Sequence, residues 1–161
     1  MSSSVAIKKR MKHLDRLYQC ELTNFCLIRY QHQLLMMAKN DSEFEPSLTF
    51  PGGHVEPDES LTASVVREVK EETSLDVNDP QLCSIVNFVT GPKTREFIFA
   101  YATTVSQKMT TQPQVGTKDE GRTFWIDIDQ IKPSQLNTVV ADVLQDYRSG
   151  IVREHDYPLE K

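Results

Sequence analysis

One stretch constrains the fold and the chemistry of this chain more than any other: residues 52–75, G-G-H-V-E-P-D-E-S-L-T-A-S-V-V-R-E-V-K-E-E-T-S-L. Its double glycine lets the backbone turn sharply and expose a carbonyl. Ser60 is then a favourable N-cap for a helix. Apolar residues follow at the spacing of a buried helical stripe, at Val65, Val66 and Val69. The stretch therefore predicts a tight turn followed by an amphipathic helix.

The predicted helix gathers three carboxylates on one face. Because successive residues are rotated by about 100°, Glu71 and Glu72 lie about 60° to one side and about 40° to the other side of Glu68. Two unit charges about 5 Å apart repel by about 3 kcal/mol at an effective dielectric constant of about 20. A divalent cation removes this cost, and hard oxygen ligands suit Mg²⁺ or Mn²⁺. The alternative is a solvated acidic helix face, where such repulsion is only a few tenths of a kcal/mol.

The spacing of these residues favours the metal site. The segment resembles the Nudix hydrolase signature, G-x5-E-x7-R-E-U-x-E-E-x-G-U with U aliphatic. The matching residues are Gly53, Glu59, Arg67, Glu68, Val69, Glu71, Glu72 and Leu75. Ser74 departs from the signature, because the family has glycine there. This departure concerns how the helix ends, since Ser carries a Cβ penalty in a left-handed turn.

The resemblance implies a role for each matched residue. Arg67 and Glu59 match a pair that orients the helix and the loop. The metal ligands implied are the carbonyl of Gly52 and the carboxylates of Glu68, Glu71 and Glu72. The implied reaction is hydrolysis of a nucleoside diphosphate linked to another group X, with Mg²⁺ as the cofactor and Mn²⁺ as its substitute.

A general base is also needed. Glu68 is one candidate. Glu120 is the other, because it precedes Trp125 in a loop where MutT-like members of the family carry an acidic residue. Asp119 is the neighbour that could replace Glu120, and the alternative for both is an ordinary loop carboxylate.

Residues outside the signature bear on the substrate. The chain resembles the MutT-like branch, which converts nucleoside triphosphates to monophosphates and acts on oxidised purine nucleotides such as 8-oxo-dGTP. The implied substrate-binding residues are Lys39, Phe50, Gly53, Arg95 and Asn137. Each of four has a structural alternative: core packing for Phe50, surface charge for the two cations, and helix capping for Asn137.

Two other functions stay open. The same chemistry could act on ADP-ribose, a nucleotide sugar, a dinucleoside polyphosphate or an RNA 5′ end. A non-catalytic Nudix module could instead bind a nucleotide as a sensor. Such modules commonly lose glutamates of the signature, whereas Glu68, Glu71 and Glu72 are all present here.

Composition limits the partners and the compartment. A net charge of −5 argues against a stable nucleic-acid partner. No apolar run is long enough to predict a membrane partner, and the first residues lack the apolar core of a signal peptide. Cys20, Cys26 and Cys83 are predicted to be buried free thiols. We therefore expect a cytoplasmic enzyme with a small nucleotide substrate, and a homodimer stays open.

The remaining pattern predicts a single Nudix domain over residues 19–149, after an N-terminal arm or short helix at 1–18 and before a loose C-terminal tail at 150–161. Strands are predicted over residues 20–30, 34–38, 48–50, 81–89, 95–105 and 122–128, with a second helix over 137–148 and a long loop over 106–121. The fold class is α/β, with a mixed β-sheet and a helix on each face. The resemblance implies the α/β/α sandwich of the Nudix fold.

Overall fold

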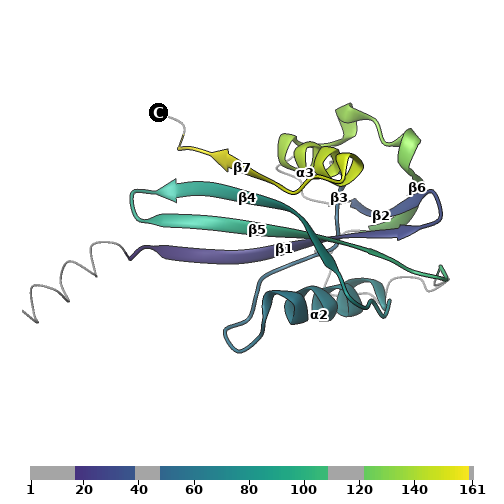
Figure 1. Cartoon of the computed structure of the whole chain (residues 1–161), viewed down its shortest axis with the longest axis horizontal. Coiled ribbons are helices and arrows are strands. Elements are labelled where there is room, and N and C mark those ends of the chain that lie inside the picture. The colour runs from purple at the N-terminus through teal and green to yellow at the C-terminus, as the bar shows by residue number, and fades with distance from the viewer. Residues whose placement is uncertain (1–16, 39–47, 109–121, 160–161) are drawn as a thin grey trace, which may run out of the picture.

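The computed structural model describes residues 17–38, 48–108 and 122–159, and these form a mixed sheet with one α-helix on each face (Figure 1). The strands are β1 (Gln19–Tyr30), β2 (Gln33–Ala38), β3 (Leu48–Thr49), β4 (Gln81–Gly91), β5 (Thr94–Thr104), β6 (Arg122–Asp127) and β7 (Arg153–Tyr157). The α-helices are α2 (Leu61–Thr73) and α3 (Thr138–Ser149), and two 3-10 turns, η1 (Ile128–Gln130) and η2 (Pro133–Gln135), precede α3. The predicted α/β sandwich is confirmed.

The sheet combines parallel and antiparallel pairs. Its strand order is β3-β2-β1-β5-β4-β7. β1 and β3 pair with the two ends of β2, and β6 pairs with β2 along its whole length. β1 runs parallel to β5 along its whole length, and β4 runs parallel to β7. The pairs β1–β2, β2–β3, β2–β6 and β4–β5 are antiparallel. Because β2 pairs with β1 only at Arg29 and Tyr30, the loop after β3 runs along the rest of that edge of β1 and hydrogen-bonds to it.

Alternating residues of β1 pack against the two helices. Leu27 belongs to the apolar cluster that contains Val143 of α3. Cys26 and Ile28 belong to the opposite cluster, which contains Val65 of α2. Because successive side chains of a strand point to opposite faces, one strand contributes to both cores. α2 is therefore held against β1 by its predicted valine stripe.

The cysteines match their prediction only in part. Cys26 is buried, Cys83 is half-buried and Cys20 is exposed, and all three are free thiols. Burial raises the pKa of Cys26 to about 12, and burial likewise raises the pKa of Cys83 to about 12. The prediction that all three are buried is wrong for Cys20, which lies at the exposed start of β1. Neither α2 nor α3, within the described ranges, is long and apolar enough to cross a membrane.

Both predicted helix starts are confirmed. The Ser60 hydroxyl accepts from the Ala63 amide at 3.1 Å, and the Asn137 side chain accepts from the Val140 amide at 2.9 Å. Each side chain supplies an acceptor to an amide that has no partner within the helix.

Ser74 ends α2 in the left-handed conformation, with φ of 59°, and its amide donates to the Lys70 carbonyl at 3.0 Å. A Cβ is unfavourable in this region, whereas glycine occupies it freely. We expect Ser74→Gly to stabilise the fold by about 0.5–1 kcal/mol, measured by urea unfolding. An unchanged or lower unfolding midpoint would show that the serine is not strained there.

The prediction of a loose C-terminal tail is wrong for part of that segment, which forms β7 and pairs with β4. Tyr157 stacks on Phe88 of β4, with ring centroids 4.9 Å apart. Asp146 of α3 is 1% exposed and accepts hydrogen bonds from Arg153 at 2.8 Å and His155 at 2.7 Å. Periodicity does not identify this strand, because its buried contacts are made by charged and aromatic side chains rather than by alternating aliphatic ones.

Asp146 also makes the stability of the fold depend on pH. Burial alone would raise the pKa of Asp146, but hydrogen bonds from Ser84, Arg153 and His155 lower it below its ordinary value. A lowered pKa in the folded state stabilises the fold above the unfolded value of about 3.9, and this stabilisation is lost as the pH falls through the folded value.

We expect Asp146→Asn to cost about 2 kcal/mol at neutral pH, and to lose less further stability than the wild type between neutral pH and about pH 3. Urea unfolding at both pH values measures this difference. Asp76→Asn, at an exposed aspartate paired with Lys70, is the matched control and should change stability little. Parallel losses of stability in the wild type and Asp146→Asn would contradict the assignment.

Candidate active site

The loop at residues 52–55 lies between the edge of β1 that β2 does not cover and the acidic side of α2. Two backbone amides of β1 donate to the carbonyls of Pro51 and Gly53, each at 2.8 Å. Because successive peptide groups of an extended chain point to opposite sides, the N–H and C=O of Gly52 are directed away from β1. The Gly52 N–H donates to Oε2 of Glu72 at 2.8 Å. The loop therefore turns the Gly52 main chain toward the glutamates of α2.

Both glycines permit contacts that a side chain would block. A Cβ at Gly52 would lie 2.0 Å from the backbone oxygen of Asn24, and the φ of Gly52 is +154°. A Cβ at Gly53 would lie 2.5 to 2.7 Å from the carboxylate atoms of Glu68. A side chain at Gly52 would therefore clash with the backbone of β1, and a side chain at Gly53 would displace the Glu68 carboxylate.

Arg67 connects the loop to the helix. Its Nε and Nη2 donate to the Glu59 carboxylate at 3.1 and 2.6 Å, and Nη2 also donates to the His54 carbonyl at 3.0 Å. Its Nη1 donates to Glu68 at 2.8 Å and to Glu71 at 3.1 Å. The planar guanidinium suits this task, because it presents five N–H donors in a fixed geometry.

The pKa values of this pair follow from those bonds. Hydrogen bonds from Arg67 and from the Glu56 amide lower the pKa of Glu59 to about 2. Hydrogen bonds to Glu59 and Glu68 raise the pKa of Arg67 above its ordinary value. Both groups are therefore charged throughout the neutral pH range.

The three glutamates share one side of α2, but their oxygens do not converge on one point in this structure. The Glu68 side chain is 15% exposed and the Glu71 side chain is 59% exposed, and both accept from Nη1 of Arg67. Glu72 instead accepts from Gly52. The positive charge between Glu68 and Glu71 is supplied here by Arg67, and the carboxylates and the loop together form an oxygen-rich site.

Another set of side chains has its possible metal-ligand atoms closer together than the three glutamates do. Within the described ranges, His32, Asp127 and Asp129 bring one ligand atom each to within 4.8 Å of one another. His32 lies in the turn between β1 and β2, and the pairing of β2 with β6 brings Asp127 beside it. The side chains of His32 and Asp129 are 57% and 79% exposed, and the imidazole bonds to Asp129 at 2.9 Å. The hydrogen bond between His32 and Asp129 accounts for this exposed group without a metal ion.

The predicted substrate residues that the structure describes have different surroundings. Phe50 is 1% exposed and packs in the core, which is the structural alternative for this residue. Arg95 donates to Asn87 at 3.0 Å, and its guanidinium lies 5.4 Å from the Tyr18 ring centroid. Asn137 caps α3. Lys39, Asp119 and Glu120 lie outside the described residues.

Two buried residues beside the loop were missed by the sequence reasoning, Asn24 and Ser64. The Asn24 side chain donates to the Ser64 hydroxyl at 2.8 Å. The sequence offers one signal for them, which is a polar residue beside apolar ones. Asn24 precedes Cys26 and Ile28 on β1, and Ser64 precedes Val65 on α2. Local spacing does not reveal this contact, because the two residues are 40 positions apart.

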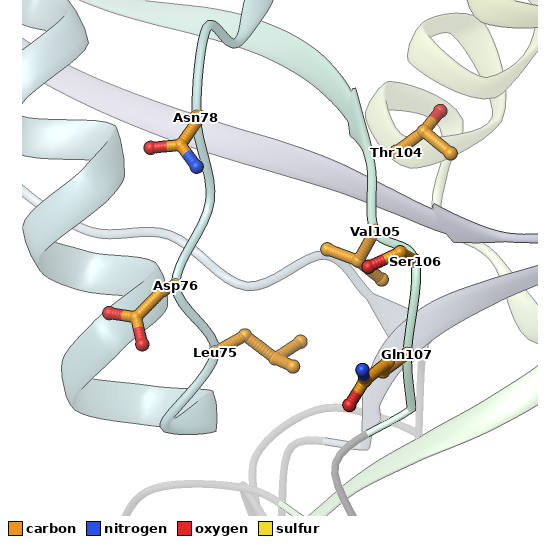
Figure 2. A pocket seen from close by; sticks show the side chains of 7 residues that line it. All are labelled: Leu75, Asp76, Asn78, Thr104, Val105, Ser106 and Gln107. Carbon is orange, nitrogen blue, oxygen red and sulfur yellow. The ribbon is translucent and has the colours of Figure 1, made fainter.

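A cavity of about 270 Å³ lies beyond the C-terminal end of α2, between the segment after the helix and the end of β5 (Figure 2). Leu75 and Val105 approach from the two facing segments, and Figure 2 shows their side chains pointing toward the space between them. The other lining residues are Asp76, Asn78, Thr104, Ser106 and Gln107. None of these is a predicted site residue, so the cavity is distinct from the acidic side of α2.

Replacing Arg67 by lysine tests its connecting role. Arg67→Lys keeps the charge but cannot donate at once to Glu59, Glu68, Glu71 and the loop carbonyl. We expect kcat/KM for nucleotide hydrolysis to fall by about 10- to 100-fold, measured by product release over a range of Mg²⁺ concentrations. Arg148→Lys is the matched control, because Arg148 donates to a single carbonyl outside this site. Unchanged kinetics in Arg67→Lys would contradict the role.

Comparison with known proteins agrees with this geometry. A model of the NUDIX domain matches residues 22–147. Phosphatase NudJ from Shigella boydii is 32% identical over 112 residues, which cover 68% of this chain and 69% of NudJ. A NUDIX hydrolase from Nitrosomonas europaea superposes with a TM-score of 0.67 at 25% identity, covering 88% of this chain and 94% of that one.

A MutT protein from Bacillus halodurans has the same fold, with a TM-score of 0.66 at 21% identity and coverage of 86% of this chain and 89% of that one. The match to the domain model extends from β1 into α3, and it includes the loop and the helix that form the candidate site. The chain therefore belongs to the Nudix hydrolase family, enzymes that act on nucleoside diphosphates linked to another group.

Proposed function

We propose that this protein is a Mg²⁺-dependent pyrophosphohydrolase that converts a nucleoside triphosphate to its monophosphate and pyrophosphate. The observation that carries the proposal is the packing of the Gly52–Gly53 loop against Glu68 and Glu72, with Arg67 joining helix and loop. This arrangement places several oxygen donors beside a main-chain turn, as a site for a hard divalent cation requires.

The residues present fit such an ion. The donors are carboxylate and carbonyl oxygens, which Mg²⁺ and Mn²⁺ prefer. Gly53 lies directly against the Glu68 carboxylate, and a side chain at Gly53 would displace that carboxylate from its present position. The Gly52 carbonyl and the carboxylates of Glu68, Glu71 and Glu72 would hold the metal.

The metal would polarise the phosphate oxygens, lower the pKa of the attacking water and neutralise the charge on the leaving pyrophosphate. The side chains of this protein provide the positioning. Arg67 fixes the direction of the Glu68 carboxylate, and Glu59 fixes Arg67 in turn. Glu68 is a candidate to accept the proton of the water, because its side chain is largely shielded from solvent. Glu120 is the second candidate, on the resemblance to MutT-like enzymes.

We propose oxidised purine nucleotides, such as 8-oxo-dGTP, as the favoured substrates, by resemblance to the MutT-like branch. The oxygen of the Asn137 amide caps α3, so its Nδ2 would donate to an acceptor on the altered purine edge, such as the added carbonyl oxygen. The three free cysteines suit a reducing compartment such as the cytoplasm.

A substrate panel tests this proposal. It contains 8-oxo-dGTP, dGTP, ADP-ribose, a nucleotide sugar, a dinucleoside polyphosphate and a 5′-triphosphorylated RNA, with pyrophosphate and orthophosphate measured separately. The proposal predicts pyrophosphate release from 8-oxo-dGTP far faster than from dGTP. Equal rates would refute the preference for the oxidised base and leave the pyrophosphohydrolase proposal intact. Turnover of ADP-ribose or a dinucleotide alone would refute the triphosphate substrate.

A second candidate function is a phosphatase activity that releases orthophosphate. It is favoured by the name of the NudJ relative, which is 32% identical over 112 residues. The separate measurement of orthophosphate in the panel distinguishes it, because a phosphatase releases no pyrophosphate from a triphosphate.

A further inference from the structure

A buried polar pair joins β1 to α2 directly behind the Gly52–His54 loop. Asn24 is 1% exposed and Ser64 is 0% exposed. Nδ2 of Asn24 donates to the Ser64 hydroxyl at 2.8 Å, and that hydroxyl donates to the His54 carbonyl at 3.2 Å. Buried amides and hydroxyls cost free energy unless they are hydrogen bonded. The pair therefore forms a directed chain of bonds from the strand, through the helix, to the loop.

This chain of side-chain bonds reaches the loop at the His54 carbonyl, and a backbone bond from β1 holds the preceding peptide. The His54 carbonyl accepts from Ser64 and also from Nη2 of Arg67 at 3.0 Å. The preceding carbonyl, that of Gly53, accepts from the backbone amide of Asn24 at 2.8 Å. The backbone oxygen of Asn24 also packs against Gly52, where a Cβ would lie 2.0 Å away. Asn24 and Ser64 thus fix the loop from its buried side, while Arg67 fixes it from the solvent side.

Stability alone does not account for a polar pair at this place. Within the described part of the chain, Oδ1 of Asn24 has no hydrogen-bond partner, and a buried unpaired acceptor lowers stability. The next residues on the same face of β1, Cys26 and Ile28, are apolar and fully buried. An apolar side chain at position 24 would continue that core without an unpaired atom. Core packing alone therefore does not explain an amide at this position.

We propose that Asn24 and Ser64 are positioning residues that hold the Gly52–His54 main chain in the geometry required for metal binding. The inference rests on the proposed function, because the Gly52 carbonyl is one of the proposed metal ligands. Groups behind a ligand control its orientation, and removing them weakens metal affinity even though they do not touch the ion.

Substitution of Ser64 tests the proposal in the full-length protein. Ser64→Ala removes the hydroxyl that links Asn24 to His54. Ser64→Cys keeps a side chain of similar size but only a weak donor. We expect both variants to raise the dissociation constant for Mn²⁺ by about tenfold, measured by titration calorimetry. The Mg²⁺ concentration for half-maximal hydrolysis should rise in parallel, whereas kcat at saturating Mg²⁺ should change less.

Ser60→Ala is the matched control on the same helix. The Ser60 hydroxyl caps α2 through the Ala63 amide at 3.1 Å, and among the described residues its side chain has no hydrogen bond to the loop. We expect Ser60→Ala to lower the thermal unfolding midpoint without changing Mn²⁺ affinity. If the role of Ser64 is purely structural, Ser64→Ala and Ser64→Cys should also lower the unfolding midpoint without changing Mn²⁺ affinity.

The outcomes separate this inference from the proposed function. Wild-type Mn²⁺ affinity in both Ser64 variants, measured well below their unfolding midpoints, would overturn the positioning role and leave the metal site intact. A wild-type protein that neither binds Mn²⁺ nor hydrolyses a nucleotide would overturn both. Weaker Mn²⁺ binding in Ser64→Ala and Ser64→Cys, together with unchanged binding in Ser60→Ala, supports the positioning role.

Discussion

Glu68→Gln is expected to lower kcat for nucleotide hydrolysis by about 100- to 1,000-fold at saturating Mg²⁺. Glutamine has nearly the same shape as glutamate and can still accept the hydrogen bond from Arg67, so the fold should persist. The carboxylate charge is lost, and with it a metal ligand and a candidate proton acceptor. Steady-state product release measures the effect, and circular dichroism checks the fold.

Glu154→Gln provides the control, because Glu154 is an exposed glutamate on β7 and lies outside the candidate site. We expect its kcat to match that of the wild type. If Glu68→Gln also retained the wild-type kcat, the assignment of Glu68 to the metal site would be wrong, whichever nucleotide is the substrate.

Gly52→Ala is expected to have the second largest effect, on both stability and activity. The new Cβ would lie 2.0 Å from the Asn24 backbone oxygen, and the φ of +154° is one that residues with a side chain rarely adopt. Because the obstacle is backbone, either β1 or the loop must shift. We expect a loss of about 2–3 kcal/mol in urea unfolding. Activity should fall by about 100-fold, because a displacement of about 1 Å disturbs the reacting geometry.

Gly150→Ala is the matched control for Gly52→Ala. Gly150 also has a positive φ, of +65°, but apart from its own chain neighbours no atom of the described residues lies within 4 Å of the place where its Cβ would stand. It ends α3, away from the loop. We expect a stability loss of about 1–2 kcal/mol with unchanged activity. Equal losses of activity in the two variants would indicate that backbone strain, rather than the contact with β1, explains the effect at Gly52.

The sequence predicts the helix and its acidic side well, because the determinants are local. Ser60 caps α2 and Val65 packs in the core, as their spacing indicates. Arg67 is eight positions from Glu59, so the loop and one helical turn are enough to bring them together. The resemblance to the Nudix signature adds the roles of these residues and the sandwich architecture.

The features that escaped prediction depend on contacts between distant segments. β7 depends on contacts with distant segments. Tyr157 packs on Phe88 of β4, and His155 bonds to Asp146 of α3. Asn24 reaches Ser64 because β1 and α2 pack together, which spacing along the chain does not show.

The substrate residues illustrate a different limit, which is that one residue type suits two roles. Phe50 is equally appropriate to a base pocket and to a core, and in this structure it lies in the core. Asparagine is a frequent helix cap, and its amide can also hydrogen-bond to the edge of a purine base. In this structure Asn137 caps α3. Residue type alone cannot decide between roles that use the same chemistry.

Calorimetric titration of MnCl₂ into the wild type and into a variant with Glu68→Gln, Glu71→Gln and Glu72→Gln tests the metal site most directly. We predict saturable binding to the wild type and none at the same site in the triple variant. Binding that persisted in the triple variant and disappeared in His32→Ala would place the ion at His32, Asp127 and Asp129 instead. That result would contradict the assignment of the α2 glutamates as the catalytic metal ligands.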